Sequence, residues 1–397
     1  MPEILREEGL QGQKKIERGN DMYSSIFKKT SILTAILLLV FSSLAFAGTN
    51  PGGPSTNGQT NINSTLSYAE VVKTLGDIEQ SSKGKVEVFT LDQYGKSEAG
   101  RSIYAAKVGT GPKKIWIQAQ IHGNEKLVTE AALDLLKTYA SNNSKDVQKV
   151  LAESTLYFIP MYNPDGAEMN TRGTKILESG KSLDLNRDWS LDGGFVAKES
   201  QVVYSYWADL KPDFAIDLHH QGIKQVYGTN EATSFSLGVS LAPNGPSLPS
   251  LKNYNDVTRQ MLAYVYDEME GYGYTHIDRY QIVDSTQQVG YDIDIKGGVV
   301  SAMMMGLDYN GLNPDHHSHP AVFFETKGNT SDGSLGQKSN GYLTKQNYLA
   351  LKSLVYGYVT GEVYEVDPNH WSDIPAYPLA GYWTDYNGIV PIGNSGY

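Results

Sequence analysis

Short apolar runs alternate with helix-like segments along most of this 397-residue chain. Apolar runs of about four to eight residues between turn residues are typical of buried strands, and apolar residues three and four apart are typical of helices. Strands are expected at Val86–Leu91, Ile103–Val108, Ile115–Ile121, Thr155–Pro160, Asp213–Leu218 and Ala321–Phe324. Helices are expected at Tyr68–Gln80, Lys126–Tyr139, Ser200–Leu210, Val257–Met269 and Lys345–Thr360. The alternation predicts an α/β fold with a mixed, largely parallel central sheet and helices on both faces.

Two of the expected strands end in side chains that bind metals. The run Lys114–Ile121 leads into His122-Gly123-Asn124-Glu125, and Asp213–Leu218 leads into His219. Sites in open α/β sheets assemble at the carboxyl ends of strands, so these residues can meet despite their separation in the sequence. Two His and one Glu, with a fourth position left to water, are the ligand set of several zinc hydrolases. The His-x-x-Glu spacing alone is weak, because a chain of this length contains such strings by chance.

A third expected strand, Ala321–Phe324, ends in Glu325. This carboxylate follows Val322-Phe323-Phe324, and such apolar surroundings raise the pKa of a carboxyl group toward that of a general base. A strand-end Glu that pairs with Lys327 is an equally simple interpretation. The residues themselves leave both open.

The segments between these strand ends carry further motifs. Asn163-Pro164-Asp165-Gly166 has turn chemistry and runs on to Arg172, and Leu183-Asp184-Leu185-Asn186-Arg187-Asp188-Trp189 follows. Together, these strings resemble the carboxypeptidase A-like zinc metallocarboxypeptidase family, in a secreted bacterial form. The resemblance starts near Leu66-Ser67-Tyr68, includes Gly95–Arg101 and runs to Phe323-Phe324-Glu325, about three quarters of the chain. Five motifs in the family's order are far more specific than any one of them.

The resemblance implies the ligands and the catalytic groups. It assigns one zinc ion per chain to His122, Glu125 and His219, and the role of general base to Glu325. Arg172 matches the arginine that polarises the scissile carbonyl. The roles are chemically sound, because zinc lowers the pKa of bound water, a carboxylate accepts the proton and a guanidinium stabilises charge on the carbonyl oxygen.

The resemblance also implies how substrate is held. Asn186 and Arg187 match the pair that binds the terminal carboxylate of a peptide, and an Arg fork suits a carboxylate bidentately. Asp184 matches the carboxylate that orients the first ligand His and fixes its tautomer. The expected reaction is hydrolysis of the C-terminal peptide bond.

His219 rather than His220 is expected to be the third ligand. The family string is Asp-Leu-His, and neighbouring residues on a strand point to opposite faces, so only one of the pair can face a metal. We therefore interpret His220 as a loop or rim residue. The loop Asp315-His316-His317-Ser318-His319 could form a second metal site, but loop clusters of this kind are more often solvated.

The first 47 residues are predicted to be a signal region. Lys28-Lys29 precede the apolar run Ile32–Phe41, which is short for a membrane span, and Ala45-Phe46-Ala47 has small residues where a signal peptidase cuts. We place the signal peptide itself at 22–47, a flexible linker at 48–65 and the catalytic domain at 66–365. Residues 366–397 are a C-terminal extension that packs on the domain or is loosely ordered. The protein is thus expected to be secreted or periplasmic.

Composition limits the partners. The formal net charge of -11 argues against nucleic acid or an anionic membrane, and the absence of Cys excludes disulfides and leaves His, Glu and Asp to bind metal. A peptide or a cell-wall peptide is the expected substrate of a monomeric enzyme. Two alternatives stay open: a peptidase or amidase of peptidoglycan on the same fold, and a secreted binding protein without turnover.

The interval 221–320 departs most from the family, and it is where the family's specificity pocket and mobile substrate-covering Tyr lie. Tyr280, Tyr291 and Tyr309 are candidates for that Tyr, with Tyr309 favoured by its place before Glu325. The residue at the base of the pocket cannot be placed from the sequence.

Overall fold

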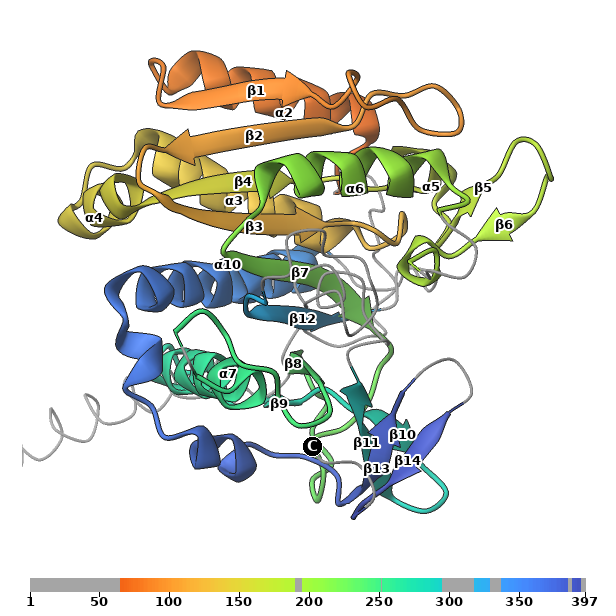
Figure 1. The fold of residues 1–397 in the computed structure, drawn as a ribbon, viewed down its shortest axis with the longest axis vertical. Helices are drawn as coiled ribbons and strands as arrows, with labels where there is room; N and C mark the ends of the chain where they lie inside the picture. The colour runs from red at the N-terminus through yellow and green to blue at the C-terminus, as the bar shows by residue number, and fades with distance from the viewer. Residues whose placement is uncertain are drawn as a thin grey trace, which may run out of the picture. The chain divides into compact units, whose positions relative to one another are not determined.

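The computed structural model describes residues 65–189, 195–250, 252–294, 318–328, 337–384 and 388–393. Its main feature is a twelve-stranded sheet in the order β1-β2-β4-β3-β7-β12-β8-β11-β13-β14, with β9 paired to β8 and β10 to β11 (Figure 1). The strands are β1 Val86–Thr90, β2 Tyr104–Gly109, β3 Lys113–Ala119, β4 Ser154–Ile159, β7 Phe214–Gln221, β8 Phe235–Leu241, β9 Ile277–Arg279, β10 Ile282–Asp284, β11 Val289–Asp294, β12 Ala321–Lys327, β13 Leu379–Trp383 and β14 Ile389–Pro391. A short hairpin, β5 Thr174–Lys175 with β6 Ser182–Leu183, lies outside this sheet.

Four neighbouring strands at the centre, β4, β3, β7 and β12, run parallel. Their carboxyl ends therefore lie at one edge, where the sequence predicted the site. On one side of this block, β2 pairs antiparallel with β4 and β1 with β2. On the other side, β8 pairs antiparallel with β12 and parallel with β9 and β11. The predicted mixed, largely parallel sheet is confirmed.

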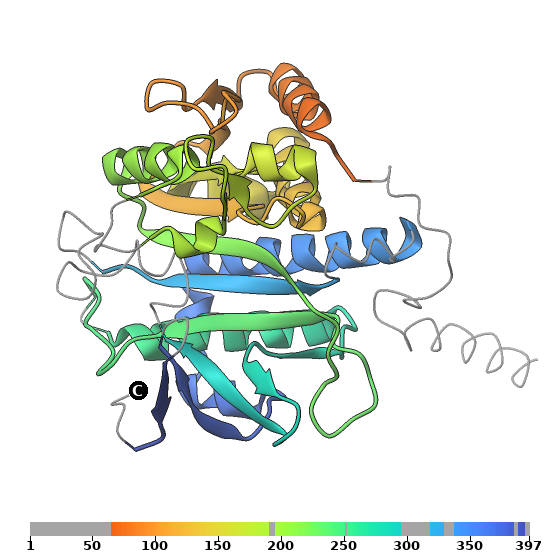
Figure 2. The ribbon, with the colours of Figure 1, turned by 90° about the vertical axis from the view of Figure 1, so that its right-hand side faces the viewer.

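Helices cover both faces of the sheet, as predicted (Figure 2). They are α2 Tyr68–Ser81, α3 Lys126–Ser141, α4 Lys145–Glu153, α5 Pro164–Met169, α6 Lys198–Leu210, α7 Tyr254–Gly271 and α10 Gln337–Thr360, with short 3-10 turns η2 Leu185–Arg187, η5 Glu362–Tyr364 and η6 Pro368–Asp373. Side chains of β3 alternate between the two cores. Ile115 and Ile117 pack in the core under α3 and α10, and Trp116 packs in the core under α6.

Several elements differ from the sequence prediction. Strand β7 continues past Leu218 to Gln221, because residues 215–221 pair with β12 up to Lys327. Residues of the expected C-terminal extension form β13 and β14, and β13 pairs parallel with β11. The sequence did not indicate α4, α5 or β8 to β11. Among the described residues, no helix has the length and apolar content that a bilayer crossing requires.

Candidate metal centre and active site

The loop between β3 and α3 carries His122 and Glu125 in a tight turn against α5. A Cβ atom at Gly123 would lie 2.1 Å from the carbonyl carbon of Gly166. The N–H of Gly123 donates to the carbonyl of Arg172 at 3.0 Å, which ties the same turn to a second loop. Glycine is thus needed between the two predicted ligands because the backbones touch.

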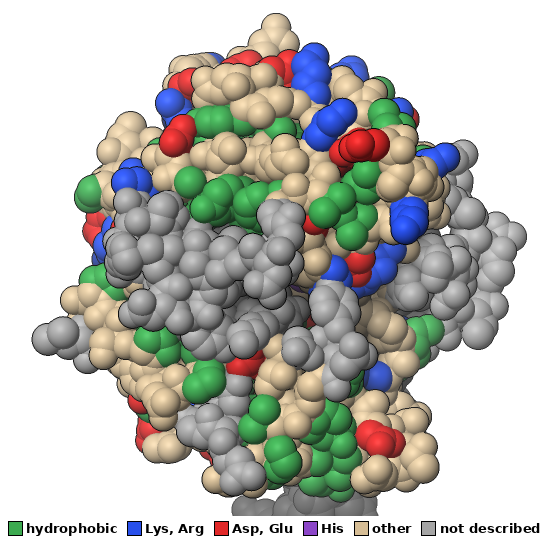
Figure 3. All heavy atoms as spheres, turned by 45° about the vertical axis from the view of Figure 1, so that its right-hand side comes forward, with side chains coloured by type: hydrophobic (Ala, Val, Ile, Leu, Met, Phe, Trp, Pro, Cys, Tyr) green, Lys and Arg blue, Asp and Glu red, His purple; other side chains and the backbone are tan. Residues whose placement is uncertain are grey.

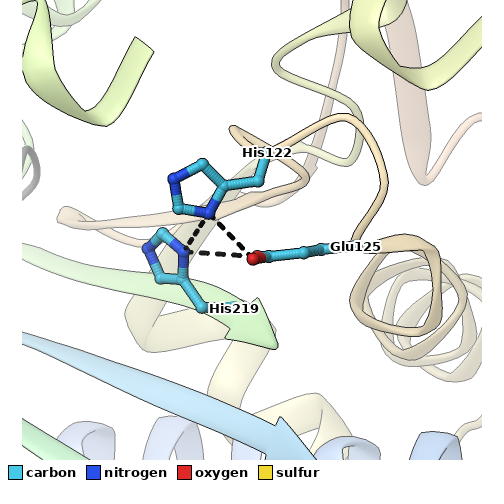
Figure 4. A group of neighbouring side chains, drawn as sticks. All are labelled: His122, Glu125 and His219. Atoms are coloured by element: carbon cyan, nitrogen blue, oxygen red, sulfur yellow. Dashed lines mark hydrogen bonds and ion pairs between the residues drawn. The ribbon is translucent and has the colours of Figure 1, made fainter. Parts of the chain in front are cut away.

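His122, Glu125 and His219 converge on one point (Figure 4). The Nδ1 atom of His122 lies 2.9 Å from Glu125 Oε1 and 3.3 Å from His219 Nδ1, and His219 Nδ1 lies 3.4 Å from Glu125 Oε2. All three side chains are buried. Within the described ranges, they form the group of His and carboxylate residues with a geometry that could hold a metal ion.

This arrangement fits zinc. With zinc–ligand bonds of about 2.0–2.1 Å, the corners of a tetrahedron lie about 3.3 Å apart, close to the separations of the three ligand atoms. The Nδ1 atoms of His122 and His219 face each other and can share at most one proton. At least one of the two nitrogens therefore has a lone pair that can bind a metal. A cation between them satisfies both lone pairs and the carboxylate at once.

Each imidazole turns its second nitrogen to a carboxylate. His219 Nε2 lies 2.9 Å from Asp217 Oδ2. His122 Nε2 lies 3.2 Å from Asp184 Oδ1, but this second pair is not aligned well enough to count as a hydrogen bond. Such carboxylates hold the ring orientation and make the free nitrogen a stronger ligand. The contact of Asp184 is the one that the sequence predicted.

The surrounding charges favour a cation at this point. Burial lowers the pKa of His219, but Asp217 and Glu125 outweigh it and raise that pKa well above its usual value. Burial alone would raise the pKa of Glu125, and the two imidazoles hold it well below its usual range instead. The carboxylates therefore stabilise positive charge on the ligand side chains, and a divalent cation meets the same field.

We expect Gly123→Ala to weaken zinc binding by about 10- to 100-fold, because the added Cβ pushes the turn off α5 and misplaces both ligands. Zinc affinity by competition with a chromogenic chelator measures the effect. Gly76→Ala is the matched control, since a Cβ at Gly76 in α2 meets nothing within 4 Å. Wild-type affinity in the Gly123 variant would show that the turn has room to adjust.

Glu325 lies on β12 directly beside His219 of β7 in the strand register. It is only 7 % exposed, and its Oε2 atom has no hydrogen-bond partner among the described residues. Burial raises the pKa of Glu325 to about 8, although His219 acts to lower it. This is the buried environment that its apolar neighbours in the sequence indicated, and the carboxylate stands next to the proposed metal position.

Arg172 and Asp184 meet at the edge of the metal site. Arg172 Nε lies 2.9 Å from Asp184 Oδ2, and a second guanidinium nitrogen lies 3.7 Å from Glu125 Oε1. The Arg172 side chain is half exposed. Burial tends to raise the pKa of Asp184, yet His122 and Arg172 hold it well below the usual range. Asp184 thus stays ionised and links the ligand imidazole to the arginine.

Asn186 and Arg187 lie in the 3-10 turn η2, directly after Asp184. Asp184 caps this turn, because its Oδ1 atom accepts a hydrogen bond from the N–H of Asn186 at 2.9 Å. The guanidinium of Arg187 donates to the carbonyl of Asn186 at 3.2 Å. Burial and the charge of Arg172 lower the pKa of Arg187, while Asp184 acts to raise it. The guanidinium groups of Arg172 and Arg187 are therefore close enough to act on each other, and both interact electrostatically with Asp184.

A cavity of about 380 Å³ opens beside these residues. It is lined by Asn124, Glu125, Arg172, His220, Gln221, Gly222 and Tyr280. Glu325 and Arg187 do not belong to this lining, but both act electrostatically on the phenol of Tyr280, whose pKa burial raises well above the usual value. The cavity therefore reaches one predicted metal ligand, Glu125, and the predicted carbonyl-polarising arginine, Arg172.

The structure places one residue differently from our sequence interpretation. His220 is not in a loop: it lies buried in β7, lines the cavity, and its N–H donates to Glu125 Oε2 at 2.9 Å. Its own Nδ1 pairs with the carbonyl of Gly328 at 2.9 Å. Among the three Tyr candidates, Tyr280 lines the cavity, while Tyr309 lies outside the described residues, as do His316 and His317.

Asp217 and Asn124 were missed by the sequence interpretation. Asp217 stands two residues before His219 on a strand, so both side chains lie on one face, and this spacing could have identified it. Asn124 lies within the first motif and lines the cavity. No spacing rule marks it, because its position depends on the turn between β3 and α3.

Comparison with known proteins agrees with this geometry. Residues 74–233 match the zinc carboxypeptidase family. Carboxypeptidase E of Caenorhabditis elegans is 27 % identical over 176 residues, which cover 40 % of this chain and 36 % of that protein. The chain spans about a third of the length of the curated relatives that it matches.

Solved structures show the same fold. Bovine thrombin-activatable fibrinolysis inhibitor, in complex with tick carboxypeptidase inhibitor, superposes with a TM-score of 0.53 at 15 % identity, over 76 % of this chain and 99 % of that one. A metallo-carboxypeptidase from Pseudomonas aeruginosa gives 0.50 at 19 % identity, over 75 % and 68 % of the two chains. These likenesses show the fold, and the match of residues 74–233 relates this chain to the zinc carboxypeptidase family.

Proposed function

We propose that this protein is an exported zinc metallocarboxypeptidase that removes the C-terminal residue of peptides. The observation that carries the proposal is the meeting of His122, Glu125 and His219 beside a cavity lined by Arg172. Glu325, buried on the adjacent strand, supplies the acid–base group that hydrolysis needs.

The chain's own residues divide the chemical work. When bound, zinc supplies a Lewis acid that polarises the carbonyl and makes water acidic enough to attack near neutral pH. Glu325 accepts the proton of the attacking water and returns it to the leaving amine. The Arg172 guanidinium donates to the carbonyl oxygen as negative charge grows there. Asp184 and Asp217 keep the two imidazoles in the orientation that the ligands require.

Recognition of the chain end falls to the turn η2. We assign the terminal carboxylate of the substrate to Arg187 together with Asn186, since a guanidinium partly removed from water gains most from an anion. Tyr280 lines the cavity with Arg172, and we assign it a contact with bound substrate. The ring of Tyr280 packs edge-on against Phe323 at 5.3 Å, which holds it at the cavity wall.

The proposed partner is supported by the surface, and the proposed location by the sequence. On the face shown in Figure 3, basic and acidic side chains of the described residues are interspersed, with no broad field of one charge. A small uncharged or weakly charged peptide suits such a surface better than a polyanion. We retain one zinc per chain, a monomer, and export through the predicted signal region 1–47 as parts of the proposal.

A peptide with a free carboxyl terminus is expected to be cleaved on the order of 10²-fold faster, in kcat/KM, than its C-terminal amide. The reason is that the amide leaves the Arg187 guanidinium without its anion. Product analysis by mass spectrometry, with a mixed peptide library, measures both rates. Arg187→Gln should remove the preference, whereas Lys149→Gln on the exposed surface of α4 should keep it.

The same experiment separates the alternatives when muropeptides are included. Sequential loss of single C-terminal residues from ordinary peptides supports the proposal. Cleavage confined to muropeptides would identify a cell-wall peptidase, and no cleavage by a zinc-loaded chain would favour the binding protein. Equal rates for amidated and free peptides would mean that Arg187 does not bind the chain end.

A further inference from the structure

A second polar cavity is separated from the catalytic cavity by the segment Arg279-Tyr280 at the end of β9. It has a volume of about 220 Å³ and is formed by α7, β9, β11, η6 and β13, the elements at the lower end of Figure 1. Successive residues of an extended chain point to opposite sides, so Arg279 faces this cavity while Tyr280 faces the catalytic one. Its volume is far above the ~10–15 Å³ that one water molecule needs. It can therefore hold a small molecule.

Two arginines line this cavity, and neither has an anionic partner in contact. Arg259 of α7 and Arg279 of β9 make no ion pair with a carboxylate of the described residues, and the Nε atom of each is buried without a hydrogen-bond acceptor there. Arg279 instead stacks on Trp371, with its guanidinium carbon 5.6 Å from the ring centre. Burial and the like charge of Arg259 lower the pKa of Arg279, although the carboxylates of Asp292 and Asp278 act to raise it. An oxyanion would relieve both effects.

Trp371 gives an independent sign of a ligand. This residue of η6 is 97 % buried (3 % exposed) and lines the cavity, yet its ring N–H has no acceptor among the described residues. Buried N–H groups almost always have a partner, in the protein or in a bound molecule. Three donors without acceptors around one cavity indicate that an acceptor is bound there.

The acidic residues of the cavity limit the ligand further. Asp292 of β11 is buried in the wall, where Gln281 donates to its Oδ1 atom at 2.9 Å, and Asp256 lies at the exposed rim. With two arginines and two carboxylates, the formal charges of the lining cancel. A dianion such as phosphate would face two negative charges, whereas a molecule with both an anionic and a cationic group can pair with each kind.

Apolar side chains complete the wall. Pro368, Leu379 and Tyr382, all from the C-terminal segment beyond residue 365, also line the cavity, and Tyr382 pairs with Asp292 in the strand register. We propose that this cavity is a binding site for a free α-amino acid with an apolar side chain, whose carboxylate lies between Arg259 and Arg279. The ammonium group faces Asp292, and the side chain packs on Leu379 and Tyr382. The site is separate from the metal centre and does not depend on the proposed peptidase activity.

Calorimetric titration of the mature chain with L-leucine tests the proposal. We expect saturable binding that weakens at least ~10-fold in Arg259→Gln, since a charged hydrogen-bond donor is lost. Binding should be unchanged in Lys149→Gln, which removes a surface cation outside the cavity. Arg187→Gln tells the two cavities apart. If this variant still binds L-leucine, the binding belongs to the second cavity. If Arg187→Gln loses L-leucine binding while Arg259→Gln keeps it, the proposal is overturned.

Three further ligands test the chemical class. Leucine amide lacks the carboxylate and 4-methylpentanoate lacks the amine, and each should bind at least ~10-fold more weakly than L-leucine. Inorganic phosphate should not compete. Equal binding of 4-methylpentanoate, or competition by phosphate, would overturn the amino-acid assignment in favour of a simple oxyanion site. The absence of any leucine binding to the wild-type chain would overturn the site itself. Because no assay here uses turnover, failure would leave the peptidase proposal intact.

Discussion

Glu325→Gln is expected to lower kcat by about 10³-fold or more while zinc remains bound. The substitution keeps the size of the side chain but removes the oxygen that accepts the proton, and general acid–base groups contribute about 10²- to 10⁴-fold to such reactions. Because Glu325 is buried beside His219, the neutral amide fits the site without desolvating a charge. Steady-state kinetics with a free peptide gives kcat, and elemental analysis gives the zinc content.

Glu199→Gln is the matched control. Glu199 of α6 is also fully buried, with a pKa that burial raises to about 7, and its Oε1 atom accepts from the hydroxyl of Thr174 at 2.9 Å. The control makes the same chemical change away from the metal ligands and should leave kcat within a few-fold. Near-normal turnover of Glu325→Gln would remove Glu325 from the mechanism and revive the binding-protein alternative.

The fold and the ligand set could be predicted because both depend on local pattern. The apolar runs of β3, β7 and β12 indicate each strand and the approximate position of its carboxyl end, and the parallel arrangement then brings those ends together. His122 and Glu125 lie in the loop that follows β3, and Glu325 lies near the carboxyl end of β12. Their meeting needs only the sheet order, which the helix-strand alternation already limits to a few possibilities.

The rest of the site depends on contacts between strands, which the pattern does not encode. The sequence of β7 loses its apolar character after Leu218, so we ended the strand there, yet pairing of Thr326 and Lys327 with its last residues extends it to Gln221. This pairing buries His220 rather than leaving it in a loop. Tertiary pairing overrides local preference in such cases.

The interval after β7 was harder still. Strands β9 and β10 have three residues each, and β9 and β11 carry polar side chains among apolar ones, such as Asp278 and Asp292. Their burial is stabilised by partners far away in the sequence: Lys224 pairs with Asp278 at 3.0 Å, and Gln281 donates to Asp292. A single sequence shows neither partner. For this reason the sequence could not single out Tyr280 among the three Tyr candidates, and it gave no sign of the second cavity.

His219→Ala is expected to lose zinc affinity by at least ~10²-fold, whereas His220→Ala should keep stoichiometric zinc. His219 is one of three side chains that can bind the zinc ion. Its removal leaves the ion with only two protein ligands, which lowers its affinity. The imidazole of His220 points elsewhere, since its Nδ1 pairs with the carbonyl of Gly328. Its contribution to the site is its backbone N–H to Glu125, which alanine retains.

The two neighbouring histidines thus serve as controls for each other, since both are buried on the same strand and lose the same atoms on substitution. Zinc content after dialysis, together with affinity by chelator competition, gives the result. Asp217→Asn should fall between them, with a loss of about 10- to 100-fold, because the amide weakens the support of His219 Nε2 without removing a ligand. Full zinc occupancy of His219→Ala, with loss in His220→Ala, would reverse our assignment of the third ligand. An intermediate loss of zinc affinity in Asp217→Asn would show that His219 binds the metal and that the carboxylate of Asp217 supports it. If His219 were only a buried side chain, Asp217→Asn would leave zinc affinity unchanged.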